Sequence, residues 1–314
     1  MFDNASIDNL PISVLIATRN RPQDLIPCLK SLLAQDYPNF EIVIFDQSVT
    51  DEAQIATRAA YGCPANLRYI RSETVGKSRA LNGLVAAAQG EIFAFTDDDT
   101  EAPPDWLATI ARAFREMPEA DLLFGQVFAP SDTQADFHVP ALYFQERRLL
   151  KQREVFGMGA NMAFRRSLIE KVIGYDTQLG PGGSLACAED YDFLYRAQKV
   201  GAAAFAEPSV QLVHRAGRNF DQWSRVLLNY GMGDAAFAMK HLRCGDWKML
   251  ANIARGLGYI SARGCLRVAQ RAPQPGEFYY VRGYWNGIWA SLKYPIDKRT
   301  RLYAPSRSAA GKGG

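Results

Sequence analysis

The first 130 residues alternate between apolar runs of strand length and segments with apolar residues at helical spacing. The runs that predict strands cover residues 12–17, 40–45, 67–70, 91–96 and 122–129. The segments that predict helices cover residues 22–35, 78–88 and 104–117. Because strands that alternate with helices favour a parallel sheet covered on both faces, the sequence predicts an α/β fold. We expect a Rossmann-like, mostly parallel sheet with helices on both faces.

This alternation ends near residue 130, and the second half of the chain follows a different pattern. Residues 131–155 are polar and match neither spacing. The further predicted elements are a strand over 158–164, a helix over 189–200 and two short edge strands over 203–206 and 210–213, around Pro208. From Asp221 onward the spacing is helical and the segment is rich in aromatic residues. The pattern therefore predicts a helical C-terminal extension.

The composition is that of a globular protein, with 48% hydrophobic and 22% charged residues in 314. The five cysteines form no CxxC pair, so neither a zinc site nor a disulfide framework is expected, and a reducing compartment fits. The chain has no run of 18 apolar residues and no signal-peptide pattern at its N-terminus. These features predict a cytoplasmic protein without a membrane-spanning helix.

The net charge of +3 is divided unevenly along the chain. Residues 243–314 contain 13 Lys and Arg against 3 Asp and Glu, a net +10, whereas residues 1–242 contain 23 against 30, a net −7. Two apolar stripes with Trp and Tyr lie in this basic segment, over 247–262 and 281–292. Basic helices with aromatic boundaries suit an anionic membrane surface. Peripheral binding to the inner face of the cell membrane is therefore expected, with packing on the N-terminal domain or across a dimer as the alternative, and the oligomeric state stays open.

Asp97, Asp98 and Asp99 directly follow the strand predicted over 91–96. Adjacent carboxylates repel one another unless a positive group lies among them, and hard divalent cations such as Mg²⁺ or Mn²⁺ are bound by carboxylate oxygens. Ligands of open α/β sheets bind beyond the carboxyl ends of the strands. The triplet therefore predicts a divalent cation site at this edge, with a solvated acidic turn as the alternative.

Polar clusters also follow two other predicted strands, at Thr18–Arg21 and at Asp46–Ser48. Each cluster alone has a simple explanation in loop and helix-cap residues, since Asn20 before Pro22 is a typical cap. Parallel strands, however, bring the three clusters to one edge of the sheet. We therefore expect one site built from all three.

Five segments in order resemble the family 2 glycosyltransferases of the GT-A fold. They are Ile-Ala-Thr-Arg-Asn-Arg at 16–21, Ile-Phe-Asp-Gln-Ser at 44–48, Gly-Lys-Ser-Arg-Ala-Leu-Asn at 76–82, Phe-Thr-Asp-Asp-Asp at 95–99 and Ala-Glu-Asp-Tyr-Asp-Phe-Leu-Tyr-Arg at 188–196. The resemblance covers roughly residues 11–218. The domains that it implies are a catalytic domain over 1–219, with a nucleotide-sugar half over 11–130 and an acceptor half over 131–219, a basic helical extension over 220–305 and a flexible tail over 306–314.

The resemblance implies a nucleoside-diphosphate sugar donor, with UDP, GDP or dTDP as the nucleotide. The residues that would bind it are Thr18, Arg19 and Asp46 around the nucleoside, Arg79 and Asn82 around the pocket, Asp97 at the ribose or a metal-bound water, and Asp98. Asp99 would be the first metal ligand and Asp97 its partner in a DxD motif, whereas alternation along the strand would point Asp98 away. The cation would stabilise the negative charge that develops on the diphosphate.

Glu189 and Asp190 begin the helix predicted over 189–200. An acid at this position is often only a cap, but the resemblance implies that the pair supplies the catalytic base of an inverting transferase. Asp190 takes this role, with Glu189 as the runner-up or an acceptor contact. Gln222 and Arg225 match part of a motif of processive members, without its following Trp, which implies transfer of a single sugar. The expected acceptor is a hydroxyl group, lipid-linked acceptors included, in cell-surface polysaccharide or glycolipid synthesis.

The sequence allows two roles for each of two basic residues, His214 and Lys77. His214 follows an apolar run, and by the resemblance it would complete the metal shell, where imidazole suits Mn²⁺ better than Mg²⁺; a structural His is equally compatible. Lys77 stands where a helix N-terminus favours phosphate, but a solvated helix face explains it as well. His138 and His241 lack a motif and are expected to be structural.

Other classes of protein fit the motifs of this sequence less well. An aspartyl phosphotransferase needs Asp-x-Asp-x-Thr, whereas Glu101 follows Thr100 here. A dinucleotide-dependent oxidoreductase needs Gly-x-Gly-x-x-Gly after the first strand, and residues 18–23 contain no Gly. The basic C-terminus carries no nucleic-acid recognition motif, so no nucleic-acid partner is expected. A non-catalytic nucleotide-sugar-binding relative and a phosphotransferase that uses the Asp cluster remain the alternatives.

Overall fold

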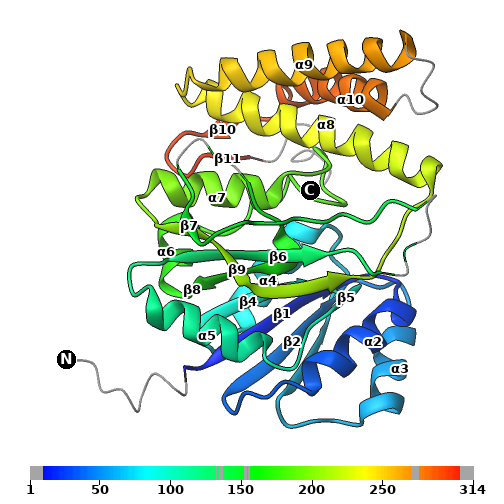
Figure 1. Cartoon of the computed structure of the whole chain (residues 1–314), viewed down its shortest axis with the longest axis vertical. Helices are drawn as coiled ribbons and strands as arrows, with labels where there is room; N and C mark the ends of the chain where they lie inside the picture. The colour runs from blue at the N-terminus through cyan, green and yellow to red at the C-terminus, as the bar shows by residue number, and fades with distance from the viewer. Residues whose placement is uncertain are drawn as a thin grey trace, which may run out of the picture.

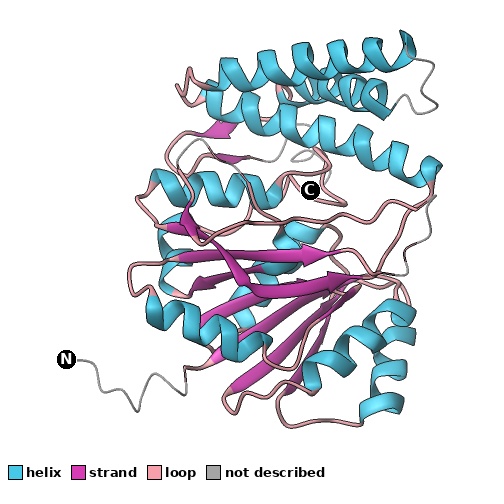
Figure 2. Ribbon diagram, in the orientation of Figure 1, coloured by secondary structure: helices cyan, strands magenta, loops and turns pink. Residues whose placement is uncertain are grey.

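The computed structural model describes residues 10–131, 133, 137–151, 154, 156–269 and 276–304. In these residues a mixed sheet lies between two sets of helices, and three long helices form a further layer on one side (Figures 1 and 2). The strands of the sheet are β1 (Ile12–Thr18), β2 (Phe40–Asp46), β3 (Leu67–Arg71), β4 (Ile92–Asp97), β5 (Thr100–Glu101), β6 (Leu122–Phe128), β7 (Arg148–Leu149), β8 (Met162–Arg165) and β9 (Ala204–His214).

The helices flank this sheet and continue beyond it. They are α2 (Pro22–Leu33), α3 (Glu52–Tyr61), α4 (Lys77–Ala87), α5 (Trp106–Glu116), α6 (Ser167–Val172), α7 (Glu189–Lys199), α8 (Phe220–Arg243), α9 (Met249–Ala269) and α10 (Gly276–Ser291), with a 3₁₀ turn at Gly159–Asn161. A short hairpin of β10 (Ile296–Asp297) and β11 (Leu302–Tyr303) follows. The predicted α/β class with a helical C-terminal part is confirmed.

The strand order is β3-β2-β1-β4-β8-β6-β9-β5, with β7 paired to β9. The pairs among β1 to β4 are parallel, as is β6 with β9, whereas β8 runs antiparallel to both β4 and β6. The sheet is therefore mostly parallel but mixed. Its register places Thr18 beside Asp46, and Ala17 beside Asp97, so that the polar clusters after β1, β2 and β4 meet at one edge.

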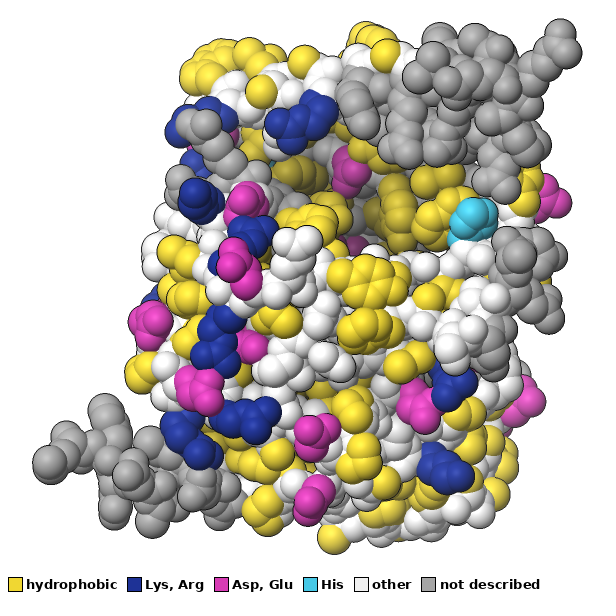
Figure 3. Space-filling view, in the orientation of Figure 1, with side chains coloured by type: hydrophobic (Ala, Val, Ile, Leu, Met, Phe, Trp, Pro, Cys, Tyr) yellow, Lys and Arg dark blue, Asp and Glu magenta, His cyan; other side chains and the backbone are white. Residues whose placement is uncertain are grey.

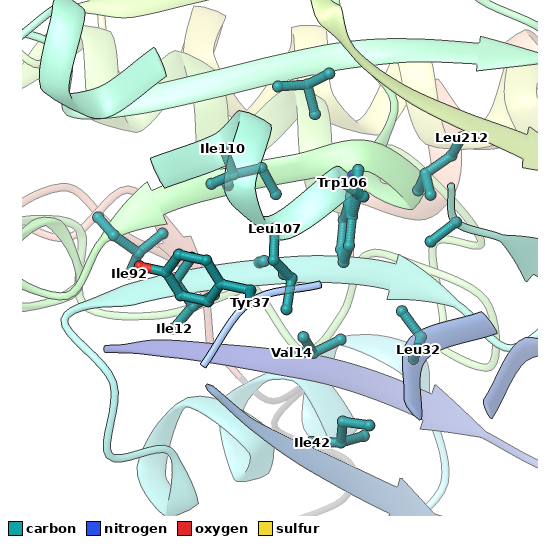
Figure 4. Packing of buried hydrophobic residues seen from close by; sticks show 14 of the residues in the cluster. Ile12, Val14, Leu32, Tyr37, Ile42, Ile92, Trp106, Leu107, Ile110 and Leu212 are labelled. Carbon is teal, nitrogen blue, oxygen red and sulfur yellow. The ribbon is translucent and has the colours of Figure 1, made fainter. Parts of the chain in front are cut away.

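The two faces of the sheet bury alternate side chains of the same strands. Val14 packs with Trp106 and Ile110 against α2 and α5 in one cluster, part of which Figure 4 shows. The next residue, Leu15, faces the opposite cluster, which includes Phe164 and covers α4, α6 and α7. Because successive side chains of a strand point to opposite faces, continuous apolar runs such as that of β1 are needed for a sheet buried on both sides.

Three details of the sequence prediction differ from the structure. The strand predicted over 158–164 begins only at Met162, because residues 159–161 form the 3₁₀ turn. The two edge strands expected around Pro208 are one continuous strand, β9, and its register against β6 shifts between Gly125 and Gln126. Pro208 lies in this bulge, where a residue without an N–H donor does not interrupt the ladder of hydrogen bonds. Helices α3 and α6 were not predicted, and both are short, with 10 and 6 residues.

The helical layer packs its helices at unusually close range. A Cβ atom added at Gly231 of α8 would overlap the carbonyl oxygen of Tyr280, and one at Gly283 of α10 would overlap that of Leu228. Close approach of two helix backbones requires residues without side chains at the contact. The layer is also tied to the part of the chain that contains the sheet, because a Cβ at Gly233 would meet the backbone of Cys187, just before α7.

Candidate active site

A cleft of about 1090 Å³ separates the sheet from the helical layer. Figure 3 shows a hollow in this region, with acidic and hydrophobic side chains at its walls. One wall carries the ends of β1 and β4 and the start of α4; the opposite wall carries α8 and part of α10. The start of α7 lies between them and supplies Glu189 and Asp190.

The aspartate triplet is held by basic and hydroxyl groups from three elements. Lys77 Nζ donates to Asp97 Oδ1 at 2.7 Å, Thr18 Oγ1 donates to Asp98 Oδ2 at 2.7 Å, and Arg21 Nη1 lies 3.1 Å from Asp99 Oδ2 and 3.3 Å from Asp98 Oδ1. Burial and the neighbouring Asp99 raise the pKa of Asp98 to about 7. The sequence places Asp98 pointing away, but its carboxylate lines the cleft.

Asp97, Asp99 and His214 form a cluster whose ligand atoms all lie within 4.8 Å of one another. The register of β5 against β9 pairs Thr100 with His214, which places the imidazole beside the triplet. His214 Nε2 lies 3.3 Å from Asp99 Oδ1. Asp99 Oδ1 and His214 Nδ1 are buried without a hydrogen-bond partner in the part of the chain that the structure describes. Two carboxylates and an imidazole, with buried atoms of Asp99 and His214 left without a partner, fit a divalent cation.

The predicted nucleoside contacts lie at different depths. Arg19 is exposed and lines the cleft with Thr18. Asp46 is fully buried; its Oδ1 accepts from the Ser48 amide at 2.8 Å and its Oδ2 accepts from the Tyr69 hydroxyl at 2.8 Å. Gln47 rather than Asp46 is among the described residues that line the cleft. A contact between Asp46 and a nucleotide base stays a prediction.

Arg79 and Asn82 form hydrogen bonds with backbone groups, and neither is among the described residues that line the cleft. Arg79 Nη1 donates to the Val75 carbonyl at 2.8 Å. Asn82 holds the backbone of Tyr175 with two bonds, a donation to the carbonyl at 3.0 Å and an acceptance from the amide at 2.7 Å. Contacts of Arg79 and Asn82 with the nucleotide stay predictions.

Lys77 is the basic residue of α4 that faces the cleft. Its ammonium group bonds Asp97 and lies 3.6 Å from Glu189 Oε1, so it bridges the triplet and the start of α7. Burial would lower the pKa of Lys77, but Asp97 and Glu189 raise it well above its ordinary value. The structure therefore excludes the alternative in which Lys77 only lies on a solvated face of the helix. Gly76 is the feature of the sequence that indicates this position, because its φ of +119° allows the chain to turn into α4 beside the cleft.

Glu189 and Asp190 differ in what they face. Glu189 is buried, and burial raises its pKa to about 7 despite Lys77. Asp190 is only partly buried; its Oδ2 accepts from the Gly159 amide at 3.0 Å and its Oδ1 from the Tyr191 amide at 2.8 Å. Burial also raises the pKa of Asp190. A carboxylate held by two amides, with lone pairs left and its pKa raised, suits a general base.

The fold and this cleft define a GT-A glycosyltransferase. The structure resembles the mannosyltransferase PcManGT of Pyrobaculum calidifontis, solved with GDP-Man and Mn²⁺, with a TM-score of 0.64 over 88% of this chain and 87% of that chain at 18% identity. It also resembles S. aureus TarS 1–349, solved with UDP-GlcNAc, with a TM-score of 0.56 over 92% and 94% at 18% identity. At these identities the likeness establishes the fold.

A family model described as Glycosyl transferase family 2 matches residues 13–173, and the chain belongs to this family. WcaA of Escherichia coli (strain K12), named as a colanic acid biosynthesis glycosyl transferase, is 27% identical over 216 residues, which cover 66% of this chain and 73% of that protein. The aligned segment of other relatives is shorter, and in a Nostoc glycosyltransferase it spans 54% of the length. The predicted family and enzyme class are thereby confirmed.

None of the helices in the described ranges combines the length and apolar character that crossing a bilayer requires.

Proposed function

We propose that the protein moves a single sugar from a nucleoside-diphosphate sugar to a hydroxyl acceptor, with inversion at the anomeric carbon and with a divalent cation. The observation that carries this proposal is the shared cleft of the Asp97, Asp99 and His214 cluster and of Asp190, which belongs to a separate element. A direct displacement requires a diphosphate-binding group and a proton acceptor around one space, and this shared cleft supports that assignment.

Asp97, Asp99 and His214 would hold the cation, for which Mn²⁺ is favoured by the imidazole. When bound, the cation supplies positive charge that stabilises the diphosphate leaving group. Lys77 and Arg21 add fixed positive charge on either side of the triplet. Both side chains therefore position the carboxylates and offset the charge of an incoming diphosphate.

Both acids line the cleft, and Asp190 acts as the base because it is partly exposed there, whereas Glu189 is buried and lies 3.6 Å from Lys77 Nζ. The acceptor hydroxyl gives its proton to Asp190 as its oxygen attacks the anomeric carbon, and the electrons of the glycosidic bond leave with the diphosphate. The amides of Gly159 and Tyr191 fix the carboxylate in place.

The donor is identified by thermal stabilisation in a panel of UDP-, GDP- and dTDP-sugars, with and without Mn²⁺. We expect one nucleotide to stabilise the protein in a metal-dependent manner. Asp190→Asn should keep this stabilisation and lower kcat by about three orders of magnitude or more, because it removes the proton acceptor. Product NMR should show the inverted anomer. A stabilisation that ignores Mn²⁺, a retained anomer or a fully active Asp190→Asn enzyme would each contradict the proposal.

We propose further that the outer face of the helical layer contacts an anionic membrane surface on the cytoplasmic side, close to lipid-linked acceptors of cell-surface polysaccharide or glycolipid synthesis. Trp247, Trp285 and Trp289 are 73%, 49% and 65% exposed. The exposed Arg282 and Lys293 accompany them on or next to α10. Aromatic side chains flanked by cations match an anionic headgroup region.

Vesicle flotation tests this surface. Full-length protein should float with vesicles that contain phosphatidylglycerol and not with pure phosphatidylcholine, and binding should weaken with salt. Trp285→Ala with Trp289→Ala should reduce binding several-fold. Ile55→Ala removes an equally exposed apolar side chain from α3 and should leave binding unchanged. If the Trp variant bound the vesicles as well as the wild type, the proposed membrane contact of this surface would be refuted.

A further inference from the structure

The outer half of the cleft differs in chemistry from the half around the aspartate triplet. Its wall consists of aromatic and apolar side chains of α8, with Tyr191 of α7 and Tyr280 of α10. Trp223 stacks on His138 with ring centroids 5.4 Å apart, and Tyr230 meets Trp223 edge to face. These rings form a partly exposed aromatic wall beside Asp190.

One carboxylate projects into this aromatic region. Asp234 of α8 lines the cleft, and its Oδ2 accepts from the Tyr280 hydroxyl at 2.7 Å. Among the described residues no other group is bonded to it, which leaves Oδ1 for a ligand. Burial and the charge of Asp190 raise the pKa of Asp234 to about 6, so the two carboxylates lie within electrostatic range of each other.

The position of Asp234 is fixed by the close helix packing. Gly233 sits directly against the backbone of Cys187, two residues before Glu189, and Gly231 sits against Tyr280. Asp234 and its partner Tyr280 are therefore held rigidly beside the residues that begin α7. A carboxylate presented by two packed helices is a preorganised hydrogen-bond acceptor rather than a mobile surface charge.

We propose that this outer half is the acceptor subsite and that it binds an oligosaccharide, with the hydroxyls of one sugar on Asp234 and the ring face of another against Trp223, because the two residues stand on α8 about 16 Å apart along the helix axis. This inference rests on the proposed transfer reaction. Aromatic side chains offer a flat apolar face to the C–H groups of a pyranose, and an ionised carboxylate accepts strong hydrogen bonds from hydroxyls. Both features are needed for a polyhydroxylated ligand with one apolar face.

The charges oppose an acceptor in which the attacking oxygen belongs to a phosphate. Asp190 and Asp234 line this part of the cleft, and Arg218 is the one cation that the described residues place there. Of the other lining cations, Arg21 pairs with Asp98 and Asp99, and Lys77 lies between Asp97 and Glu189. A phosphate beside Asp190 and Asp234 would meet like charge. The terminal sugar of an acceptor, lipid-linked or free, meets no such repulsion.

The test compares octyl glycosides of di- and trisaccharides of common hexoses and hexosamines with a short polyprenyl phosphate that carries no sugar. Full-length protein is saturated with Mn²⁺ and the nucleotide sugar that stabilises it, and acceptor binding and stimulated release of nucleoside diphosphate are measured. At least one glycoside should bind and stimulate release. Asp234→Asn keeps an acceptor for Tyr280 and should raise the acceptor KM about ten- to hundredfold without changing nucleotide affinity.

Trp223→Ala should raise the acceptor KM in the same way, Trp223→Phe should restore part of the affinity, and Ile55→Ala should have no effect. The acceptor proposal is overturned if no glycoside binds although the nucleotide does, or if the polyprenyl phosphate alone binds and neither substitution changes its KM. Loss of nucleotide binding in the unmodified protein would instead contradict the proposed transfer reaction, so the two failures are distinguishable.

Discussion

Lys240→Met should destabilise the protein strongly, because Lys240 is a fully buried cation. Its ammonium lies 2.6 Å from Asp176 Oδ2 and 2.6 Å from Asp192 Oδ1, and all three side chains are 0% exposed. After the substitution Asp192 keeps Arg196 at 2.8 Å and His241 at 2.9 Å. Asp176 keeps only backbone amides, so the substitution leaves one carboxylate without a counter-charge.

Removing one partner of a buried ion pair costs about 3–5 kcal/mol. We therefore expect urea unfolding to show a loss of this size and the Tm to fall by roughly 6–10 °C, at about 2 °C per kcal/mol for a chain of this length. Asp176→Asn in the Lys240→Met background should recover part of the loss, because it removes the unpaired charge. Arg215→Met breaks the exposed pair with Glu101 and should cost less than about 1 kcal/mol.

The same cluster predicts a pH dependence. Burial would raise the pKa of Asp192, but Lys240, Arg196 and His241 hold it well below its ordinary value. A carboxylate with a depressed folded-state pKa stabilises the protein above its unfolded pKa of about 4 and loses this contribution as the pH falls. The difference between wild type and Lys240→Met should therefore narrow below about pH 4. A Lys240→Met protein within 1 kcal/mol of wild type at pH 7, or a double variant without recovery, would refute this reasoning.

Two further predictions concern the metal cluster and the helical layer. Asp99→Asn or His214→Ala should lower Mn²⁺ affinity at least about tenfold in titration calorimetry, whereas Asp24→Asn, outside the cluster, should not. If both cluster variants bound Mn²⁺ as tightly as the wild type, these residues would not be the metal ligands. Gly283→Ala should cost about 1–3 kcal/mol in urea unfolding because its Cβ meets the Leu228 carbonyl, whereas Gly258→Ala, which has open space, should be neutral or stabilising. If neither substitution lowered the free energy of unfolding, α8 and α10 would be able to move apart without loss of stability.

Much of the fold is encoded locally. The apolar runs of β1, β2 and β4 and the leucine spacing of α2 are patterns of neighbouring residues, and the structure has these elements close to the predicted bounds. The polar clusters at their ends could also be read, because parallel strands place their carboxyl ends together. Strand β9 was misread, since a bulge that accommodates Pro208 depends on the partner strand β6 and not on the local pattern.

The site itself was only partly readable from the sequence. Asp97, Asp99 and Asp190 stand in motifs and lie around one cleft. Asp234 and Tyr280 are 46 positions apart and have no motif, so only the packing of α8 against α10 reveals their bond. The glycines at 231, 283 and 287 were a signal for that packing, because small residues spaced by four mark a helix face that can approach a neighbour closely.

The sequence by itself determined the α/β alternation, the family and the identity of the acidic groups, because these depend on short-range patterns and on residue types in order. Only the tertiary structure decided which charges meet. It placed Lys77 between Asp97 and Glu189, turned Asp46 toward Tyr69 and brought His214 to the aspartate triplet. Such partnerships depend on distances between residues far apart in the chain, and burial then sets their strength by removing the water that would screen them.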